Sequence, residues 1–159
     1  MNKALFLDRD GIINHDPGDY TRSWDEFHFL PGIERFLKKK QEEGFLLILI
    51  TNQGGVAKGL YSIETVDEIH VKMKAHFNTY GVHIDEIYYS PYHDDYSKSL
   101  SRKPGSIMIE KALARFNIDA SMSFMIGDKD RDVACAENAG VRGYKVPVNS
   151  DLNTVFSHD

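Results

Sequence analysis

Short stretches of consecutive apolar residues alternate along this chain with segments of helical periodicity, and this alternation limits the fold more than any other feature. The apolar stretches have the length of strands and resemble strands that are buried on both faces of a sheet. We expect strands at residues 4–7, 45–50, 85–90, 123–126 and 143–148, with helices over 31–44 and 62–80, from 104 onward, and up to 140. Alternating strands and helices predict an α/β fold, a doubly wound (Rossmann-like) parallel sheet with helices on both faces.

The segment between the first strand and the first helix has no clear period. Residues 9–30 are rich in Gly, Pro, Asp and aromatic residues, which favours a loop with a small hairpin. We expect Trp24, Phe27 and Phe29 to anchor this loop on the core.

Length and composition exclude several classes of protein. At 159 residues the chain has the size of one domain, and we expect residues 1–159 to form a single one. The formal net charge of −5 argues against sequence-independent binding to nucleic acid or to an anionic membrane. The single cysteine, Cys135, excludes an internal disulfide, and no apolar stretch approaches the roughly 20 residues of a membrane span. We expect a cytoplasmic monomer or weak homo-oligomer that acts on a small molecule.

Polar clusters follow the expected strands at the points where the strands end. The clusters are Asp8-Arg9-Asp10-Gly11, Thr51-Asn52-Gln53 and Gly127-Asp128-Lys129-Asp130, and Arg102-Lys103-Pro104 precedes a helix. The carboxyl ends of parallel strands share one edge of the sheet, where ligands bind in such folds. The sequence therefore predicts one crevice that gathers three carboxylates, a hydroxyl and two cations.

The chemistry of such a crevice follows from its charges. Carboxylates that lie close together repel, so some of them must bind a proton or a cation. Oxygen ligands favour a hard ion such as Mg²⁺, and a divalent cation beside Lys and Arg makes a site for phosphate. A carboxylate there can attack phosphorus to give an aspartyl-phosphate. A second carboxyl, two residues further on, can protonate the leaving oxygen and later activate water.

These motifs, in this order, resemble the four motifs of the haloacid dehalogenase-like (HAD-like) hydrolase superfamily. The residues in and around these motifs are similar to those of one branch, the heptose-1,7-bisphosphate phosphatases and the related histidinol-phosphate phosphatases. The segments that carry this resemblance are 5–11, 51–59, 87–91, 102–105 and 125–129.

The resemblance implies a role for each matching residue. Asp8 would be the nucleophile and Asp10 the general acid and base, while Thr51 and Lys103 would hold the transferring phosphoryl group. Mg²⁺ would be held by Asp8, Asp128 and the main-chain carbonyl of Asp10. The residues implied to line the substrate site are Asn52, Gln53, Arg102 and Lys129, with Asp16 and Tyr20 from a substrate loop. Asp132 either supports the metal site or stabilises the start of a helix.

One segment departs from the pattern of that branch, which usually has a zinc-binding loop with Cys and His ligands. The corresponding positions here are Ser90, Tyr92, Ser99 and Ser101, and hydroxyls are poor zinc ligands beside thiolates. We expect no structural zinc and a loop held by packing of Tyr88, Tyr89, Tyr92 and Tyr96.

The spacing of the motifs also bears on domain insertions. About 20 residues separate Asp10 from the first helix, and about a dozen separate Ser90 from Lys103. Neither segment can hold a cap domain of roughly 50 residues or more, so we expect a capless enzyme with an open site.

The resemblance implies a Mg²⁺-dependent phosphomonoesterase whose best specific substrate is the 7-phosphate of a heptose bisphosphate in bacterial surface-polysaccharide synthesis. A histidinol-phosphate phosphatase is the alternative within the class. A phospho-receiver domain is a non-enzymatic alternative, but it would need a carboxylate after the third strand, where the chain reads Tyr89-Ser90-Pro91. A nucleic-acid end phosphatase fits an open site, but the acidic charge counts against it. We expect Arg102, with Lys58 and Lys129 as alternatives, to reach a distant polar or anionic group of the substrate.

Overall fold

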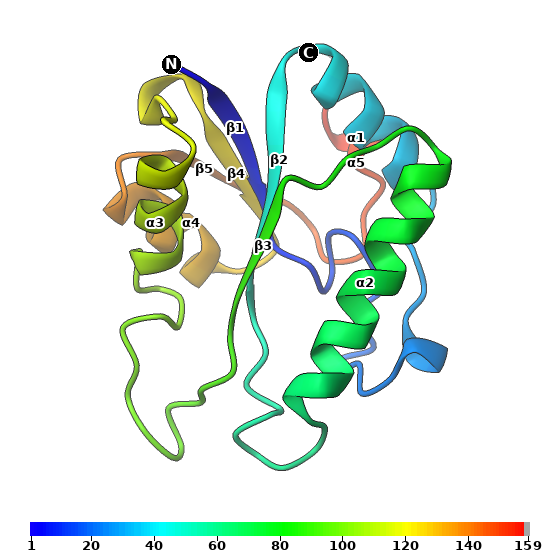
Figure 1. Ribbon diagram of the computed structural model, residues 1–159, viewed down its shortest axis with the longest axis vertical. Helices are drawn as coiled ribbons and strands as arrows, with labels where there is room; N and C mark the ends of the chain where they lie inside the picture. The colour runs from blue at the N-terminus through cyan, green and yellow to red at the C-terminus, as the bar shows by residue number, and fades with distance from the viewer. Residues whose placement is uncertain (158–159) are drawn as a thin grey trace.

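A five-stranded parallel sheet forms the centre of the computed structural model, which describes residues 1–157 (Figure 1). The strands are β1 (Lys3–Leu7), β2 (Phe45–Asn52), β3 (Glu86–Ser90), β4 (Phe124–Gly127) and β5 (Arg142–Lys145), in the order β3-β2-β1-β4-β5. Every neighbouring pair is parallel. The predicted α/β parallel sheet is therefore confirmed.

Helices cover both faces of the sheet, as predicted (Figure 1). They are α1 (Ile33–Glu42), α2 (Ile63–Thr79), α3 (Ile107–Arg115), α4 (Asp130–Asn138) and the short α5 (Leu152–Val155). Alternate residues of β1 feed two separate cores, because strand side chains point alternately to opposite faces. Leu5 and Leu7 pack with α1, α2 and α5, whereas Ala4 and Phe6 pack with α3 and α4.

The order of the strands creates a switch point beside β1. The chain moves from β1 through β2 to β3 and then crosses to β4 on the other side of β1. Ligands in open α/β sheets bind where the order reverses, at the carboxyl ends of the strands. Asp8 follows β1 and Asp128 follows β4, so two of the predicted site residues flank this point.

Several boundaries differ from the prediction. α3 begins at Ile107 rather than at Pro104, because residues 102–105 form a turn closed by the Gly105 amide on the Arg102 carbonyl. β5 spans Arg142–Lys145 rather than 143–148, since Pro147 has no amide hydrogen to continue the ladder. The short helix α5 was not predicted.

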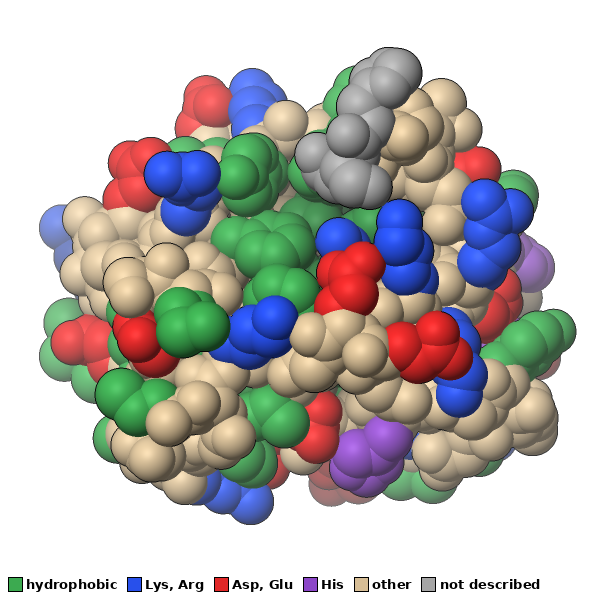
Figure 2. Space-filling view, turned by 90° about the horizontal axis from the view of Figure 1, so that it is seen from above, with side chains coloured by type: hydrophobic (Ala, Val, Ile, Leu, Met, Phe, Trp, Pro, Cys, Tyr) green, Lys and Arg blue, Asp and Glu red, His purple; other side chains and the backbone are tan. Residues whose placement is uncertain are grey.

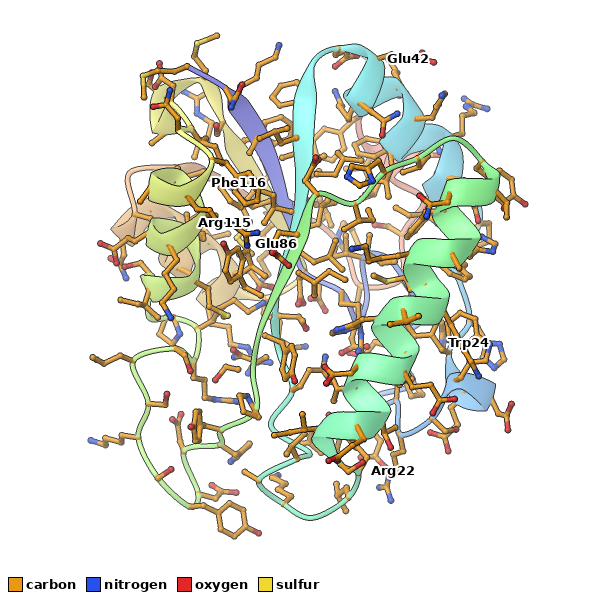
Figure 3. All side chains as sticks on the ribbon, in the orientation of Figure 1. Arg22, Trp24, Glu42, Glu86, Arg115 and Phe116 are labelled. Carbon is orange, nitrogen blue, oxygen red and sulfur yellow. The ribbon has the colours of Figure 1, made fainter. Side chains whose placement is uncertain are left out.

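The long segment between β1 and α1 is anchored on the core, as predicted. Trp24 belongs to a 3-10 turn, η1 (Trp24–Glu26), and stacks on Phe27 with ring centroids 5.2 Å apart. Trp24 lies beside α2 in Figure 3. The segment has an isolated antiparallel bridge between Asn14 and Phe29 rather than a full hairpin. The fold is capless, because within the described residues neither this segment nor the β3–α3 segment contains an inserted layer.

The edge strand β3 is tied to the helix beside it by an ion pair. Glu86 of β3 and Arg115 of α3 point toward one another (Figure 3) and form this pair, and the Arg115 guanidinium also lies 4.8 Å from the centre of the Phe116 ring. The contact joins the sheet edge to its covering helix.

The face at the amino ends of the strands is seen in Figure 2. Acidic and basic side chains of the described residues are interspersed there around a group of hydrophobic ones. Among the described residues, no helix has the length and apolar character that a bilayer crossing requires.

Candidate active site

A buried lysine links the end of β1, strand β2 and helix α4. The Lys103 ammonium donates to the Asp8 carboxylate over 3.0 Å, to the Asp132 carboxylate over 2.6 Å and to the Ile50 carbonyl over 2.9 Å. The Lys103 side chain is only 1% exposed, and all three of its donors are used. Burial would lower the pKa of Lys103, but the charges of Asp8 and Asp132 outweigh burial and raise it. Lys103 therefore stays protonated.

Three carboxylates gather around this lysine. One oxygen from each of Asp8, Asp128 and Asp132 lies within 4.8 Å of the others. Asp128 is buried, and its Oδ1 atom has no hydrogen-bond partner among the described residues. A buried acceptor without a partner is costly, and a hard cation satisfies both this oxygen and the excess negative charge. The donor set therefore fits Mg²⁺.

Asp132 contacts both the buried lysine and the start of α4. Its Oδ1 atom accepts from Lys103, and its Oδ2 atom accepts from the Lys129 amide over 3.1 Å. Asp132 thus caps the first turn of α4 and also holds the lysine. Both of its oxygens already accept hydrogen bonds, so Asp8 and Asp128 are better placed to be metal ligands.

Burial and neighbouring carboxylates raise the pKa of Asp8 to about 7. Burial is the largest cause, the Lys103 charge opposes it, and the carboxylates of Asp132, Asp10 and Asp128 add to the rise. A divalent cation would reverse this effect, because a nearby positive charge favours the ionised carboxylate. Ionisation of Asp8 is therefore favoured by a cation bound beside it.

The second carboxylate has a different environment. Asp10 Oδ1 accepts from Arg9 and from Asn14, and its Oδ2 atom accepts from Gln53 over 3.0 Å. Burial raises the pKa of Asp10, but the Arg9 charge and these hydrogen bonds outweigh burial and lower it. Two carboxylates two residues apart thus have pKa values shifted in opposite directions, which is the pattern of an acid–base pair with separate roles.

Arg9 is held by groups that the sequence did not reveal. Its guanidinium is fully buried and lies 3.1 Å from His70 Nε2. Burial, followed by the Arg9 charge, lowers the pKa of His70 to about 3, so the neutral imidazole accepts this hydrogen bond. The side chain of Phe27 lies 5.6 Å from the same guanidinium. His70 and Phe27 therefore position Arg9 against Asp10.

The polar end of β2 supports the lysine and the second carboxylate. The side-chain NH₂ of Asn52 donates to the main-chain carbonyl of Lys103 over 3.2 Å. The side-chain oxygen of Asn52 accepts from the main-chain amide of Lys103 over 3.0 Å. The Thr51 hydroxyl accepts from Gln53 over 3.0 Å, and Tyr61 donates to the other end of the Gln53 amide over 2.9 Å. These side chains fix the groups that surround the crevice.

A cavity of about 300 Å³ opens over these groups. Its lining contains seven predicted residues, Asp8, Asp10, Asp16, Tyr20, Asn52, Lys103 and Lys129, together with Gly18, Asp19 and Arg131. Asp128 lines an adjoining cavity that shares Asp16, Gly18 and Lys129 with the first. Thr51 and Gln53 are buried behind the lining.

Arg102 lies to one side of this cavity. Its guanidinium donates to the Tyr92 carbonyl over 3.0 Å and lies 3.8 Å from the Asp94 carboxylate. It lines a separate depression with residues of the 94–105 segment. The structure thus brings the predicted residues together at one edge of the sheet, except that Arg102 contacts the neighbouring loop.

The loop that contains Asp16 and Tyr20 is tied to the segment that follows β5. The side-chain NH₂ of Asn149 donates to the main-chain carbonyl of Asp16 over 2.9 Å, and the side-chain oxygen of Asn149 accepts from the main-chain amide of Asp16 over 2.7 Å. At the other end, the Lys58 ammonium lies 5.4 Å from the centre of the Tyr20 ring. Both contacts hold the loop beside the cavity.

Three hydroxyls meet in the loop after β3, and of the expected tyrosines Tyr88 packs against the core. The Ser101 hydroxyl lies 2.8 Å from the hydroxyls of both Ser90 and Ser99. Tyr92 and Tyr96 are exposed at 47% and 65%, so the expectation that tyrosines hold this loop is wrong in their case. We call the three hydroxyls the serine cluster. It occupies three of the four positions where the related branch usually has zinc ligands.

Sequence reasoning missed several contributors to the site. Arg9 lies within the first motif, and its position between two aspartates was a usable signal. His70, Asn14 and Asn149 come from a helix and from two loops, and only the folded chain brings them near the site. Arg131 is the second residue of α4 and looks like a surface residue in the sequence.

The comparisons with known proteins agree with this geometry. The HAD-hydrolase-like family model matches residues 100–151. The chain is 40% identical to D-glycero-beta-D-manno-heptose-1,7-bisphosphate 7-phosphatase of Haemophilus ducreyi, over 88% of this chain and 80% of that one. It is 38% identical to the enzyme of that name from Haemophilus influenzae, over 97% of this chain and 83% of that one.

A solved structure extends the likeness to three dimensions. The D,D-heptose 1,7-bisphosphate phosphatase of B. bronchiseptica, complexed with magnesium and phosphate, matches with a TM-score of 0.87 and 30% identity, over 98% of this chain and 86% of that one. The order of the motifs, the sheet on which they lie and a likeness that spans most of both chains make this chain a member of the heptose-bisphosphate phosphatase family of HAD-like hydrolases.

Proposed function

We propose that this phosphatase removes the 7-phosphate of D-glycero-D-manno-heptose 1,7-bisphosphate through a covalent intermediate on Asp8. The observation that carries the proposal is the opposed environment of the two carboxylates. Asp8 faces a lysine and two further carboxylates, whereas Asp10 is held apart by Arg9, Asn14 and Gln53. Relatives with that substrate in their names support the choice of sugar.

In the first step, a carboxylate oxygen of Asp8 attacks phosphorus and the bond between phosphorus and the sugar oxygen breaks. Asp10 gives its proton to the leaving oxygen. Asp10 is ionised in the free protein because its pKa is lowered, and the negative charge of a bound phosphate raises that pKa so that the carboxylate can take up the proton. Lys103 neutralises charge on the transferring group.

In the second step, Asp10 removes a proton from water and the water oxygen attacks phosphorus. The bond between Asp8 and phosphorus breaks, which releases inorganic phosphate and restores the Asp8 carboxylate. Gln53 holds Asp10 in place throughout, and the Thr51 hydroxyl holds Gln53. The same carboxyl group thus serves as acid and then as base.

The side chains of Asp8 and Asp128, with the main-chain carbonyl of Asp10, would hold Mg²⁺ in this site. When bound, the ion supplies positive charge that favours the ionised form of Asp8 and offsets charge on the phosphoryl oxygens. The magnesium named in the structure of the B. bronchiseptica enzyme supports this assignment.

We expect Mg²⁺ to raise the melting temperature more at pH 8 than at pH 5.5. The folded-state pKa of Asp8, at about 7, lies above its ordinary value of 3.8, so the metal-free fold loses stability as the pH rises between these values. At pH 5.5 the ion must displace a proton, whereas at pH 8 Asp8 is already ionised. A concentration 100 times the Kd adds about 2.7 kcal/mol, which scanning fluorimetry detects as a shift of about 2–4 °C per kcal/mol.

The matched control for this measurement is Asp128→Asn, which removes a proposed ligand and should lose most of the shift. EDTA should stop activity without unfolding the protein, and elemental analysis should find less than one zinc per chain, since the serine cluster lacks thiolate ligands. An equal or larger shift at pH 5.5 would contradict the metal assignment, and stoichiometric zinc would contradict the account of the loop.

The substrate assignment is tested by comparing kcat/KM values. We expect heptose 1,7-bisphosphate to exceed heptose 7-phosphate, and both to exceed histidinol phosphate. Lys103, Lys129 and Arg131 line the cavity, and a second phosphate can pair with one of these cations, whereas the ammonium of histidinol cannot. Analysis of the product should show loss of the C7 phosphate and retention of the C1 phosphate. A preference for histidinol phosphate would refute the substrate and leave the phosphatase chemistry standing.

Other properties expected from the sequence stay predictions. These are the cytoplasmic location, a monomeric or weakly associated state, and the lack of nucleic-acid and membrane partners. A gel-shift assay with a phosphorylated oligonucleotide tests nucleic-acid binding. Size-exclusion chromatography with light scattering measures the oligomeric state.

A further inference from the structure

Arg131 occupies an unfavourable position for a basic residue. It is the second residue of α4, which begins at Asp130. The amino terminus of a helix carries partial positive charge, so an arginine there lacks the stabilisation that an acidic residue receives. Residues that break a local rule in this way are often retained for function. Arg131 also lines the cavity above Asp8 and Lys103.

The acidic neighbours of Arg131 along the chain pair with other cations. Asp128 lies 3.4 Å from Lys129, Asp130 lies 3.0 Å from Lys145, and Asp132 lies 2.6 Å from Lys103.

No partner in the described part of the chain takes up one of the Arg131 donors. Its Nε atom is buried and forms no hydrogen bond within residues 1–157. A buried charged donor without an acceptor is costly, so at this atom no hydrogen bond offsets the positive charge that Arg131 brings to the cavity wall.

A second arginine adds to the positive charge at this place. Burial, followed by the charge of Arg131, lowers the pKa of Arg102, because the two positively charged guanidiniums repel one another. Arg102 has contacts of its own, with the Tyr92 carbonyl and the Asp94 carboxylate. Arg131 therefore has the freer guanidinium of the two, on the side of the cavity.

We infer that Arg131 binds the second, non-transferred phosphate of a bisphosphate substrate. This inference rests on the proposed function and adds the residue that distinguishes a bisphosphate from a monophosphate. Lys103 is committed to Asp8, where the transferring group sits, so it cannot serve the other end of the substrate. A guanidinium matches a phosphate with two parallel hydrogen bonds, and a lysine in its place would keep the charge without this geometry.

The test compares heptose 1,7-bisphosphate with heptose 7-phosphate in Arg131→Gln. A charge-assisted contact of this kind corresponds to about ten- to a hundredfold in kcat/KM. We expect the ratio of the two kcat/KM values to fall by that factor in Arg131→Gln and by less in Arg131→Lys. The matched control is Arg142→Gln, which removes an exposed arginine from β5 and should keep the wild-type ratio.

A second measurement separates this inference from the substrate assignment. Heptose 1-phosphate, which carries only the non-transferred phosphate, should inhibit hydrolysis of an aryl phosphate, and its inhibition constant should rise about tenfold or more in Arg131→Gln. If the wild-type enzyme hydrolyses neither heptose ester, the proposed function fails and the inhibition still decides the role of Arg131. A ratio that is the same in wild type and Arg131→Gln, or inhibition that does not change, would overturn the inference.

Discussion

The Asp8→Asn variant should release no measurable phosphate, with kcat lower by on the order of 10⁴-fold or more. A neutral carboxamide is a poor nucleophile and cannot form an acyl phosphate. The loss should be in kcat, because Lys103, Asn52 and Lys129 still line the cavity. Rapid acid quench followed by mass spectrometry should find a phosphoryl group on the Asp8 peptide of the wild-type enzyme and none in the variant.

Asp10→Asn is the matched control for this result, since it makes the same chemical change two residues away. It should slow turnover by about 10²- to 10⁴-fold, the usual contribution of a general acid–base group. The phosphoryl label should still form on Asp8, with a good leaving group such as an aryl phosphate. Turnover near the wild-type rate in Asp8→Asn, or label on another residue, would contradict the mechanism.

Lys103→Met should lower the free energy of unfolding by about 3–5 kcal/mol at pH 8 as well as abolish activity, because it leaves Asp8 and Asp132 buried without their counterion. The loss should be smaller at pH 5.5. Lys103 lowers the pKa of Asp8 against the effect of burial, so its removal raises that pKa further, and a raised carboxyl pKa costs stability as the pH increases. Urea denaturation at the two pH values measures both effects.

The matched control is Lys111→Met, an exposed lysine on α3, which should change stability by about 0.5 kcal/mol or less. Saturating Mg²⁺ should recover part of the stability of Lys103→Met by supplying positive charge. A loss that is equal at both pH values would show that packing, rather than charge, dominates at this position.

The sequence allowed the fold and the centre of the site to be predicted because both depend on strand order. Apolar stretches that end in polar residues identify parallel strands and their carboxyl ends. Asp8, Thr51 and Asp128 had to meet once the strands were parallel, since these ends share one edge. No fine boundary was needed for that conclusion, and the late start of α3 left it unchanged.

Other parts of the site could not be predicted because they depend on where long side chains reach. Arg102 precedes α3 and Arg131 lies in the first turn of α4, and nothing in their spacing indicates which one faces the cavity. The choice is made by the loop after β3, whose Tyr92 carbonyl takes up Arg102. The role of His70 could not be predicted either. His70 lies on α2 and acts only because Arg9, which follows β1, turns inward to meet it.

The serine cluster has a consequence for how the enzyme withstands oxidants. Peroxide converts thiolates to sulfenic acids and disulfides, whereas alcohol side chains do not follow that ladder. A loop held by Ser90, Ser99 and Ser101 keeps its bonds under conditions that dismantle a thiolate site. The single cysteine, Cys135, is fully buried, and burial is the main cause that raises the pKa of its thiol to about 11. Sugar phosphate turnover by this chain should therefore continue through oxidative stress.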